Sequence, residues 1–150
     1  MSRKSAYGKE RLAVSQLERG HKKGREMLAH RWDRVVDALN EAGTDFAKYV
    51  LEFAYGEVYL RPGLDMRSRE LIAVTCLTLQ GLMPQLETHV HAALDAGITE
   101  AELEEVFIHL ALYAGFPTAL FGLKTVRKVL RTRTRTRRTS TEGVTGQKKK

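Results

Sequence analysis

The sequence predicts an all-α protein, a compact multi-helix subunit, and three observations support this class. Apolar residues recur along most of the chain at the i, i+3, i+4, i+7 spacing of one helix face. No segment shows the clean alternation of apolar and polar residues that is typical of a half-buried strand. Glycines and capping residues stand where these helical runs begin and end. We therefore expect helices and no sheet.

The N-terminal half is expected to contain three helices. A polar helix is predicted from about Lys9 to Leu28, and a shorter one follows from Trp32 to Leu39. Ala42 and Gly43 end the second helix, and Thr44 can cap the third. The predicted apolar face of this third helix consists of Phe46, Tyr49, Val50 and Phe53.

The stretch FAYGEVYLRPGLD, residues 53–65, joins the third helix to the C-terminal half. It contains two glycines and a proline, which break helices, and also acids, tyrosines and an arginine that a connector does not need. We interpret it as both a corner and part of a site. The Pro-Gly pair turns the chain, and Asp65 caps the next helix. Arg61 and Glu57 would then lie beside a pocket, next to a helix N-terminus that favours an anion.

The C-terminal half is expected to contain four helices, each delimited by glycine, proline or a cap. The predicted helices are Met66–Gln80 before Gly81, Pro84–Ala96 before Gly97, Thr99–Tyr113 with a capping box of Thr99 and Glu102, and Pro117–Leu130 after Gly115. No repeat and no second domain is expected. The sequence thus predicts a disordered N-terminus over residues 1–8 and a single helical domain over residues 9–130.

Charge is distributed unevenly along the chain, whose net charge is +7. Residues 1–31 carry +6, residues 32–130 carry −6 and residues 131–150 carry +7. A domain that binds nucleic acid usually carries its basic stripe on the folded surface, so this acidic middle argues against such a domain. Residues 131–150 alternate Arg with Thr, and we expect a basic disordered tail. It is either a solvated extension or a segment that makes weak, non-specific contacts with nucleic acid or anionic lipid.

The chain has one cysteine, Cys76, which excludes an intrachain disulfide and a cysteine-rich metal site. We find no apolar run near the roughly 18 residues that span a bilayer, and no apolar core of a secretory signal at the N-terminus. We therefore expect a soluble cytoplasmic protein with no membrane partner and no bound metal.

Glu70 is the first candidate for chemistry. It lies on the buried-face spacing of its helix together with Ala73, Val74 and Leu77, and it is the one charge on that stripe. A buried carboxylate is costly unless it is paired or protonated. Glu70 therefore has either a functional role or a salt bridge to Arg67 or Arg69.

Histidines on the next two helices are the second candidates. His89 lies on an apolar face with Leu86 and Val90, and His91 lies about 200° around the same helix. A histidine on such a face is often an ordinary core residue, but if His89 faces Glu70 the two can form an acid–base pair. His109 adds a third polar residue, on a face shared with Tyr113.

Arg61 and Cys76 can each be explained by a structural role as well as by a functional one. Arg61 precedes a proline, where its guanidinium can bind a substrate carboxylate through two hydrogen bonds. A structural bond to Glu57 or to backbone carbonyls would explain it equally well. Cys76 shares a helix face with Ile72 and Leu79, away from Glu70, and we expect it to be buried and inert.

Three segments together resemble a known family. They are YGEVYLRPGLDMRSRELIAV, GLMPQLETHVHAALDAG and ELEEVFIHLALYAGFPTAL, and over roughly residues 17–130 the chain resembles the carboxymuconolactone decarboxylase family. The resemblance implies an all-helical subunit that assembles into a ring-like homo-oligomer, a trimer or a hexamer. The founding activity of the family converts 4-carboxymuconolactone to 3-oxoadipate enol-lactone in the protocatechuate branch of aromatic catabolism. That carboxy-lyase reaction needs no cofactor.

The resemblance also assigns roles for a small carboxylated substrate. The unsaturated lactone accepts the electrons left by CO2, so an enzyme must hold carboxylates, stabilise an oxyanion and deliver one proton. Arg61 would bind a carboxylate, and His89 would be the proton donor or the oxyanion partner. The remaining pocket residues would be Glu57, Glu70, His109 and Tyr113.

A related group, the alkylhydroperoxidase-D-like proteins, carries a Glu, a Cys-x-x-Cys pair and a His at fixed spacing. Glu70 and His89 match the Glu and the His, but Leu82 and Gln85 stand at the two cysteine positions. A dithiol peroxidase mechanism therefore cannot operate in this chain. Two alternatives to a decarboxylase stay open: a single-thiol redox protein that uses Cys76, and a non-enzymatic oligomeric scaffold with basic arms.

Overall fold

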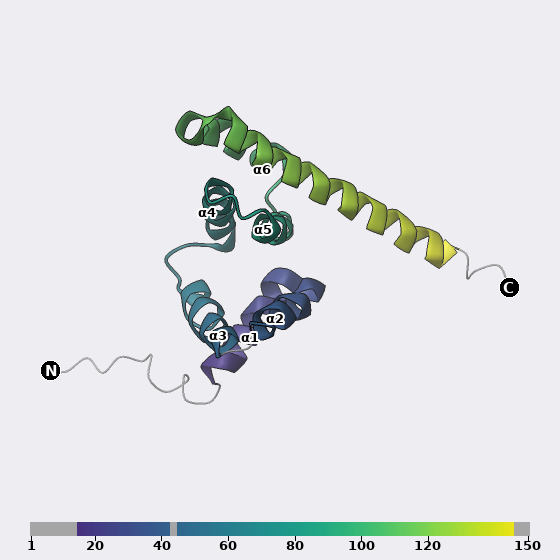
Figure 1. Cartoon of the computed structure of the whole chain (residues 1–150). Coiled ribbons are helices and arrows are strands. Elements are labelled where there is room, and N and C mark those ends of the chain that lie inside the picture. Colours follow the sequence, from purple (N-terminus) through teal and green to yellow (C-terminus); the bar gives the residue numbers. More distant parts are fainter. Residues whose placement is uncertain (1–14, 43–44, 146–150) are drawn as a thin grey trace. The chain divides into compact units, whose positions relative to one another are not determined.

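The computed structural model describes residues 15–42 and 45–145, and it describes side chains as far as residue 135 (Figure 1). These residues form helices and no strand, which confirms the all-α class. They divide into two compact units, Met1–Asp65 and Met66–Lys150, and each unit is described by itself. The single domain predicted over residues 9–130 stays a prediction.

The first unit consists of short helices. They are α1 (Gln16–Leu28), the 3-10 helix η2 (Ala29–Arg31), α2 (Trp32–Asn40), α3 (Phe46–Tyr49), the π-helix η3 (Val50–Tyr55) and the 3-10 helix η4 (Val58–Leu60). Helix α1 begins at a capping box, in which the Glu18 backbone N–H donates to Ser15 Oγ and the Ser15 N–H donates to Glu18 Oε2. The predicted helix is confirmed from Gln16 to Leu28, and its predicted part over residues 9–14 lies outside the described residues. Gly43, the predicted helix end, and the predicted cap at Thr44 also lie outside them.

Glycine lets α1 approach η3 closely. A Cβ on Gly20 would lie 2.1 Å from the Leu51 carbonyl oxygen, so this position excludes a side chain. Trp32 is fully buried beside α1, and its indole N–H donates to His21 Nδ1 at 3.3 Å. The edge of the indole also meets the Tyr55 ring, with 4.6 Å between ring centroids. These contacts form the core of the first unit.

The predicted apolar face of the third helix is wrong. Phe46, Tyr49 and Phe53 are 53%, 67% and 66% exposed, whereas the buried residues are Ala47, Leu51 and Tyr55. The physical reason is that the segment carries a second apolar stripe, Ala47, Leu51 and Tyr55, and this second stripe is the one that is buried. Sequence spacing does not tell which of the two stripes is covered.

The second unit consists of three longer helices, and its predicted helix starts and stops are largely confirmed. The helices are α4 (Met66–Leu79), α5 (Met83–Asp95) and α6 (Glu100–Thr145). Gly81 and Gly97 follow the first two helices with φ of 71° and 82°, which glycine adopts without a steric penalty. The capping box of Thr99 and Glu102 is present at the start of α6.

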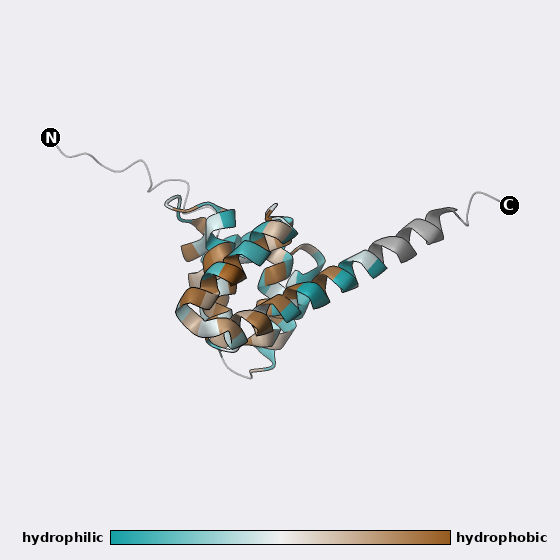
Figure 2. Cartoon of the chain, turned by 90° about the horizontal axis from the view of Figure 1, so that it is seen from above, coloured by the Kyte–Doolittle hydropathy of each residue, from teal (hydrophilic) through white to brown (hydrophobic). Residues whose placement is uncertain are grey.

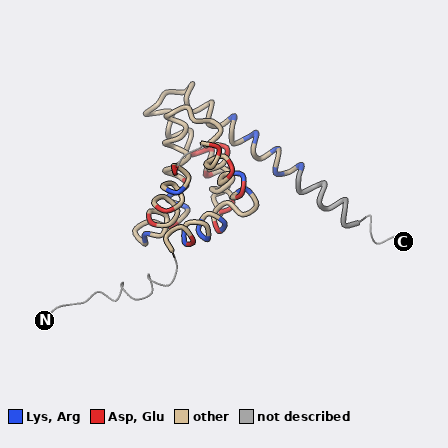
Figure 3. The backbone as a smooth tube through the Cα atoms, turned by 60° about the horizontal axis from the view of Figure 1, so that its bottom comes forward, with Lys and Arg blue, Asp and Glu red and all other residues tan. Residues whose placement is uncertain are grey.

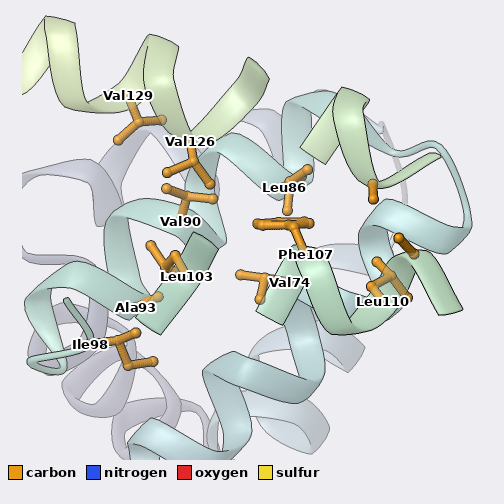
Figure 4. Packing of buried hydrophobic residues seen from close by; sticks show 12 residues of the cluster. Val74, Leu86, Val90, Ala93, Ile98, Leu103, Phe107, Leu110, Val126 and Val129 are labelled. Atoms are coloured by element: carbon orange, nitrogen blue, oxygen red, sulfur yellow. The ribbon is translucent and has the colours of Figure 1, made fainter. Parts of the chain in front are cut away.

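Helix α6 is interrupted at Gly115, whose φ of 77° and ψ of 155° are not helical, and Pro117 follows in the next turn. This confirms the predicted break. Both parts of α6 contribute to one core with α4 and α5, in which Phe107 lies close to Val74 and Leu86 (Figure 4). A Cβ on Gly122 would lie 2.1 Å from the Phe107 ring, so glycine is required there for the second part of α6 to pack.

Helix α6 extends further than the sequence predicted. The sequence placed the end of the last helix near Leu130 and a disordered tail from residue 131, but the helix continues to Thr145. Arg133 explains part of this extension, because it contacts Asp95 and His91 on α5. The hydroxyls of Thr132 and Thr134 donate to backbone carbonyls four residues earlier. Residues 146–150 lie outside the described part of the chain, as do residues 1–8 of the predicted disordered N-terminus.

Helix α6 also corrects the expectation about apolar runs. By length and composition alone, the stretch Glu100–Arg135 could cross a membrane. The run between Glu105 and Lys124 has no charge, although Gly115 and Pro117 interrupt it. One face of the same helix is buried against α4 and α5, as in the core helix of a globular protein.

Candidate functional site

Glu70 lies on the face of α4 that packs into the second unit. Its exposed fraction is 0%, and Val74 and Thr78, four and eight residues later, are also buried. The predicted stripe is therefore confirmed at its centre. Thr78 satisfies its own hydroxyl by donating to the Val74 carbonyl at 2.7 Å, so Glu70 is the buried group on this stripe that needs a partner from another helix.

That partner is His89 on α5. His89 Nδ1 lies 2.9 Å from Glu70 Oε2, and 18% of the His89 side chain is exposed. The condition set from the sequence, that His89 faces Glu70, is met. The alternative salt bridge to Arg67 is not formed, because Arg67 binds Glu102 at 2.5 Å and also donates to the Gly97 carbonyl.

Glu70 and His89 share a proton in their hydrogen bond. A hydrogen bond between a carboxyl and an imidazole needs one proton between Glu70 Oε2 and His89 Nδ1. The other oxygen of Glu70, Oε1, is buried and has no hydrogen-bond partner among the described residues. An ionised carboxylate with one unsatisfied oxygen is more costly to bury than a neutral carboxyl group. The hydrogen bond uses Nδ1, so Nε2 is the ring nitrogen of His89 that is left to bond or exchange a proton with another group.

His109 and Tyr113 lie together on the outside of α6. Their ring centroids are 5.3 Å apart with an interplanar angle of 63°, and both side chains are exposed. Within the described part of the chain, no hydrogen bond or ring contact joins them to the pair of Glu70 and His89. The structure thus brings together two of the candidate residues on α4 and α5 and two others on α6.

Arg61 and Glu57 belong to the first unit. Arg61 has extended backbone angles, φ of −68° and ψ of 136°, directly after η4, and its side chain is exposed. Glu57 is half-buried and accepts a hydrogen bond from Gln16 Nε2 at 3.5 Å. Gly56 allows the start of α1 to approach this segment closely, because a Cβ would lie 2.4 Å from the Gln16 carbonyl oxygen. The roles predicted for Arg61 and Glu57 stay predictions.

The prediction that Cys76 is buried is wrong. Cys76 is exposed, and its neighbours on the same face, Ile72 and Leu79, are each 52% exposed. Helix α4 carries two apolar stripes, and only the stripe with Glu70 and Val74 packs against α5 and α6. Sequence spacing cannot tell which of two apolar stripes is covered.

The role of Arg133 in joining two helices was not predicted from the sequence. It lies 2.6 Å from Asp95 Oδ1 and also contacts His91, so it joins the C-terminal part of α6 to α5. His91 thus has a partner different from that of His89, as expected from its position on another face. The interacting residues are about forty positions apart in the sequence, so local spacing gave no signal. In the described ranges, no group of three or more His, Cys, Asp or Glu residues could hold a metal ion.

The fold and the pair define a class of all-helical proteins in which a buried glutamate and a histidine on consecutive helices are hydrogen-bonded. The chain belongs to the carboxymuconolactone decarboxylase family, whose sequence model matches residues 44–128.

Two relatives bear names that state an activity. The chain is 33% identical over 99 residues to the 4-carboxymuconolactone decarboxylase of Acinetobacter baylyi, a match that covers 66% of this chain and 74% of that protein. It is 30% identical over 118 residues to the nitrosuccinic acid decarboxylase of Metarhizium robertsii, covering 76% of this chain and 80% of that protein. A 15.0 kDa protein of Paracoccus denitrificans is 33% identical over 82 residues, covering 53% and 61% of the two chains.

Proposed function

We propose that the protein is a carboxy-lyase that decarboxylates a small acid with two carboxylates, without an organic cofactor. The observation that carries this proposal is the 2.9 Å contact between His89 Nδ1 and the fully buried carboxyl of Glu70. Such a pair can hold a proton out of bulk water and present it through the second nitrogen of the imidazole. Leu82 and Gln85 stand where the related dithiol proteins have cysteines, so the pair suits proton transfer rather than dithiol chemistry.

The names of the two relatives suggest what the substrates share. In 4-carboxymuconolactone, the electron pair left by CO2 passes into an unsaturated lactone. In nitrosuccinic acid, it can pass into a nitro group. In both acids the departing carboxylate is attached near a group that takes negative charge onto oxygen. We therefore propose that the substrate of this protein combines a carboxylate with such an electron-accepting group, and that 4-carboxymuconolactone is the first compound to test.

The proposed reaction has two steps. First, the bond between carbon and the carboxylate breaks, CO2 leaves, and its electron pair is delocalised onto an oxygen of the substrate. Second, starting from a protonated Glu70, His89 Nε2–H donates its proton to the carbanion carbon while the proton on Glu70 Oε2 moves to Nδ1. A proton from water then enters at Nε2 and the Nδ1 proton returns to Glu70 Oε2, which restores the starting state.

The other candidate residues have proposed roles in binding. The guanidinium of Arg61 would bind a carboxylate of the substrate through two hydrogen bonds. Contacts with the substrate are likewise the roles proposed for Glu57, His109 and Tyr113. We also propose that the protein is a cytoplasmic homo-oligomer, a trimer or a hexamer. Large apolar side chains on α6 that the second unit leaves exposed, such as Leu112 and Phe116, support this assembly.

The test is an assay of CO2 release from 4-carboxymuconolactone and, in parallel, from nitrosuccinic acid. We expect turnover by the wild type and a loss of at least about 100-fold in His89→Ala, because a positioned proton donor contributes that much or more. His91→Ala is the matched control, since it removes an imidazole from the same helix but from a different face. Equal rates in wild type and His89→Ala would overturn the role of His89, and no CO2 from either acid would overturn the proposed substrate class.

A second candidate function gains support from the exposure of Cys76. A single-thiol redox protein needs an accessible sulfur, and the structure provides one. The two functions are separated by Cys76→Ser. A decarboxylase keeps its rate in this variant, whereas a thiol-dependent peroxide reduction is lost.

A further inference from the structure

We propose that the exposed basic face of the C-terminal half of α6 binds the sugar–phosphate backbone of nucleic acid, independently of base sequence. This face is defined by Lys124, Arg127, Lys128, Arg131 and Arg135, and we call it the basic face of α6. All five side chains are exposed. The residues from Lys124 to Arg135 include six cations and no acid. Figure 3 shows these cations following one another along the described end of the helix.

The spacing of the cations places them on one side of the helix. Lys124, Lys128, Arg131 and Arg135 stand at i, i+4, i+7 and i+11, which is the repeat of a single helix face. Eleven residues of α-helix extend over about 16 Å. A duplex carries about ten phosphate charges over that length. A row of guanidinium and ammonium groups with this reach can contact several phosphates at once.

The alternation of Arg and Thr has a different meaning on a helix than in a disordered segment. Arg133 lies about 180° around the helix from Lys124, on the side that faces α5. There it binds Asp95 at 2.6 Å and contacts His91. Arg131 and Arg135 lie on the opposite side, on the basic face. Alternate arginines thus serve two purposes, since one joins the helix to its unit and its neighbours face outward.

The basic face is also held on a folded surface. Val126 and Val129, on the inner side of the same turns, are 2% and 0% exposed in the core of the second unit. Lys128 binds Glu87 of α5 at 2.6 Å, which further fixes the helix. A folded surface that carries a basic stripe is the feature expected of a domain that binds nucleic acid. The sequence alone placed two of these cations, Arg131 and Arg135, in a disordered tail.

Like charges one turn apart disfavour a helix, and here they recur between Lys124 and Lys128, Arg127 and Arg131, and Arg131 and Arg135. A polyanion along this face would remove that repulsion. A lipid surface fits less well, because a helix that lies on a membrane inserts the apolar side of the same turns. Here that side, with Val126 and Val129, is already in the core. In Figure 2 the hydrophobic colouring of α6 gives way to hydrophilic colouring toward this end.

The test uses the full chain and two fluorescein-labelled probes of about two helical turns with the same arbitrary sequence, one a DNA duplex and one an RNA duplex. Fluorescence anisotropy is measured between 50 and 200 mM KCl. For the wild type we expect a dissociation constant in the micromolar range and a linear fall of log K with log salt concentration. Binding of both probes would mean that the basic face recognises the phosphate backbone that DNA and RNA share. Binding of one probe alone would mean that it also distinguishes the helical form of that duplex.

The test variant is Arg127→Gln/Arg131→Gln/Arg135→Gln, which keeps long, helix-favouring side chains but removes three charges. We expect at least tenfold weaker binding and a salt slope reduced by about three. Arg127→Lys/Arg131→Lys/Arg135→Lys should bind within about threefold of the wild type, because phosphate contacts depend on charge. The matched control, Lys22→Gln/Arg25→Gln/Arg34→Gln, removes three exposed cations from α1 and α2 and should also bind within about threefold. Circular dichroism confirms that each variant is folded.

Several results would overturn the proposal. One is the absence of binding to either duplex at 50 mM KCl. Another is an equal loss of affinity in the test variant and the α1–α2 control, which would mean that net charge alone is responsible. A third is tighter binding to vesicles of phosphatidylserine and phosphatidylcholine than to the duplexes, with that binding lost in the test variant. This result would assign the basic face to a membrane surface.

Discussion

At the scale of the residue, Glu70 combines complete burial with a carboxyl oxygen that has no partner among the described residues. A group that served packing alone would be better replaced by an apolar side chain of similar volume, because burying a carboxyl is costly. Its one hydrogen bond is to His89, whose side chain is partly exposed. The pair thus connects a buried carboxyl to a partly exposed imidazole.

Two substitutions of Glu70 should separate its chemical role from its role in packing. Glu70→Gln keeps the volume, and its amide can either donate a hydrogen bond to His89 or accept one from it, so we expect the free energy of unfolding to change by less than about 1 kcal/mol. The amide cannot transfer its proton, so kcat should fall about 100-fold. Glu70→Ala also leaves a cavity and should lower the free energy of unfolding by about 2–4 kcal/mol. Urea denaturation and the CO2 assay measure the two effects.

Thr78→Val is the control for these variants, because it changes a buried polar residue on the same stripe without contacting His89. It should leave kcat unchanged. A Glu70→Gln protein with wild-type turnover would show that no proton passes through Glu70, whatever its effect on stability.

The sequence was sufficient to select Glu70 and His89 as residues that could form a pair, because each is the polar residue on an otherwise apolar face of its helix. It was not sufficient for Cys76, since α4 has two apolar stripes and the spacing is the same for both. The positions of Arg61, Glu57, His109 and Tyr113 were correct as helix or turn positions. Their contacts depend on tertiary structure, which local spacing does not encode.

At the scale of the element, the start of α6 is fixed by three reinforcing contacts. The Glu102 backbone N–H donates to the Thr99 hydroxyl, and the Thr99 backbone N–H donates to Glu102 Oε2 at 2.8 Å. Arg67 of α4 binds the other oxygen of Glu102. The backbone N–H of Thr99, then its hydroxyl, and to a smaller extent Arg67 lower the pKa of Glu102 below its ordinary value of 4.5, against an opposing effect of desolvation.

The cap should make stability depend on acid pH. Because the pKa of Glu102 is lower in the folded state, its contribution is complete above pH 4.5 and is lost as the pH falls through the folded pKa. We therefore expect the melting temperature of the wild type to fall more steeply below pH 4.5 than that of Glu102→Gln. Glu104→Gln removes an exposed carboxyl from the same turn outside the cap and should behave like the wild type. Parallel curves for wild type and Glu102→Gln would contradict this account.

Helix ends marked by glycine or a capping box were predictable, because a single residue imposes the local conformation at Gly81, Gly97 and Thr99. The π-helix Val50–Tyr55 was not predictable, since no residue type demands it. The length of α6 depends on the contact of Arg133 with Asp95, which joins residues far apart in the sequence.

At the scale of the whole molecule, exposed apolar residues are the most informative surface feature. On α6 they include Leu112, Tyr113 and Phe116, which are 74%, 77% and 79% exposed. The second unit already has a core formed by the other side of the helix. A group of large apolar side chains of this kind usually marks a surface that another protein surface covers.

We expect Leu112→Glu/Phe116→Glu to weaken the proposed homo-oligomer, because each buried carboxylate would be unpaired in an apolar interface. Size-exclusion chromatography with light scattering should show a mass near that of a monomer for this variant and a multiple of 16.9 kDa for the wild type. Arg34→Glu, an exposed change on α2, is the control and should assemble normally. A wild type that elutes as a monomer at all concentrations would refute the assembly.

The exposure of Cys76 allows a distance within the chain to be measured by fluorescence. The sequence has a single cysteine and a single tryptophan. Cys76 lies on the outside of α4 in the second unit, and Trp32 lies in the core of the first. A dye that absorbs tryptophan fluorescence, attached to this one thiol, forms an energy-transfer pair with Trp32 without any mutation. The transfer efficiency then reports changes in the distance between Cys76 and Trp32 in solution.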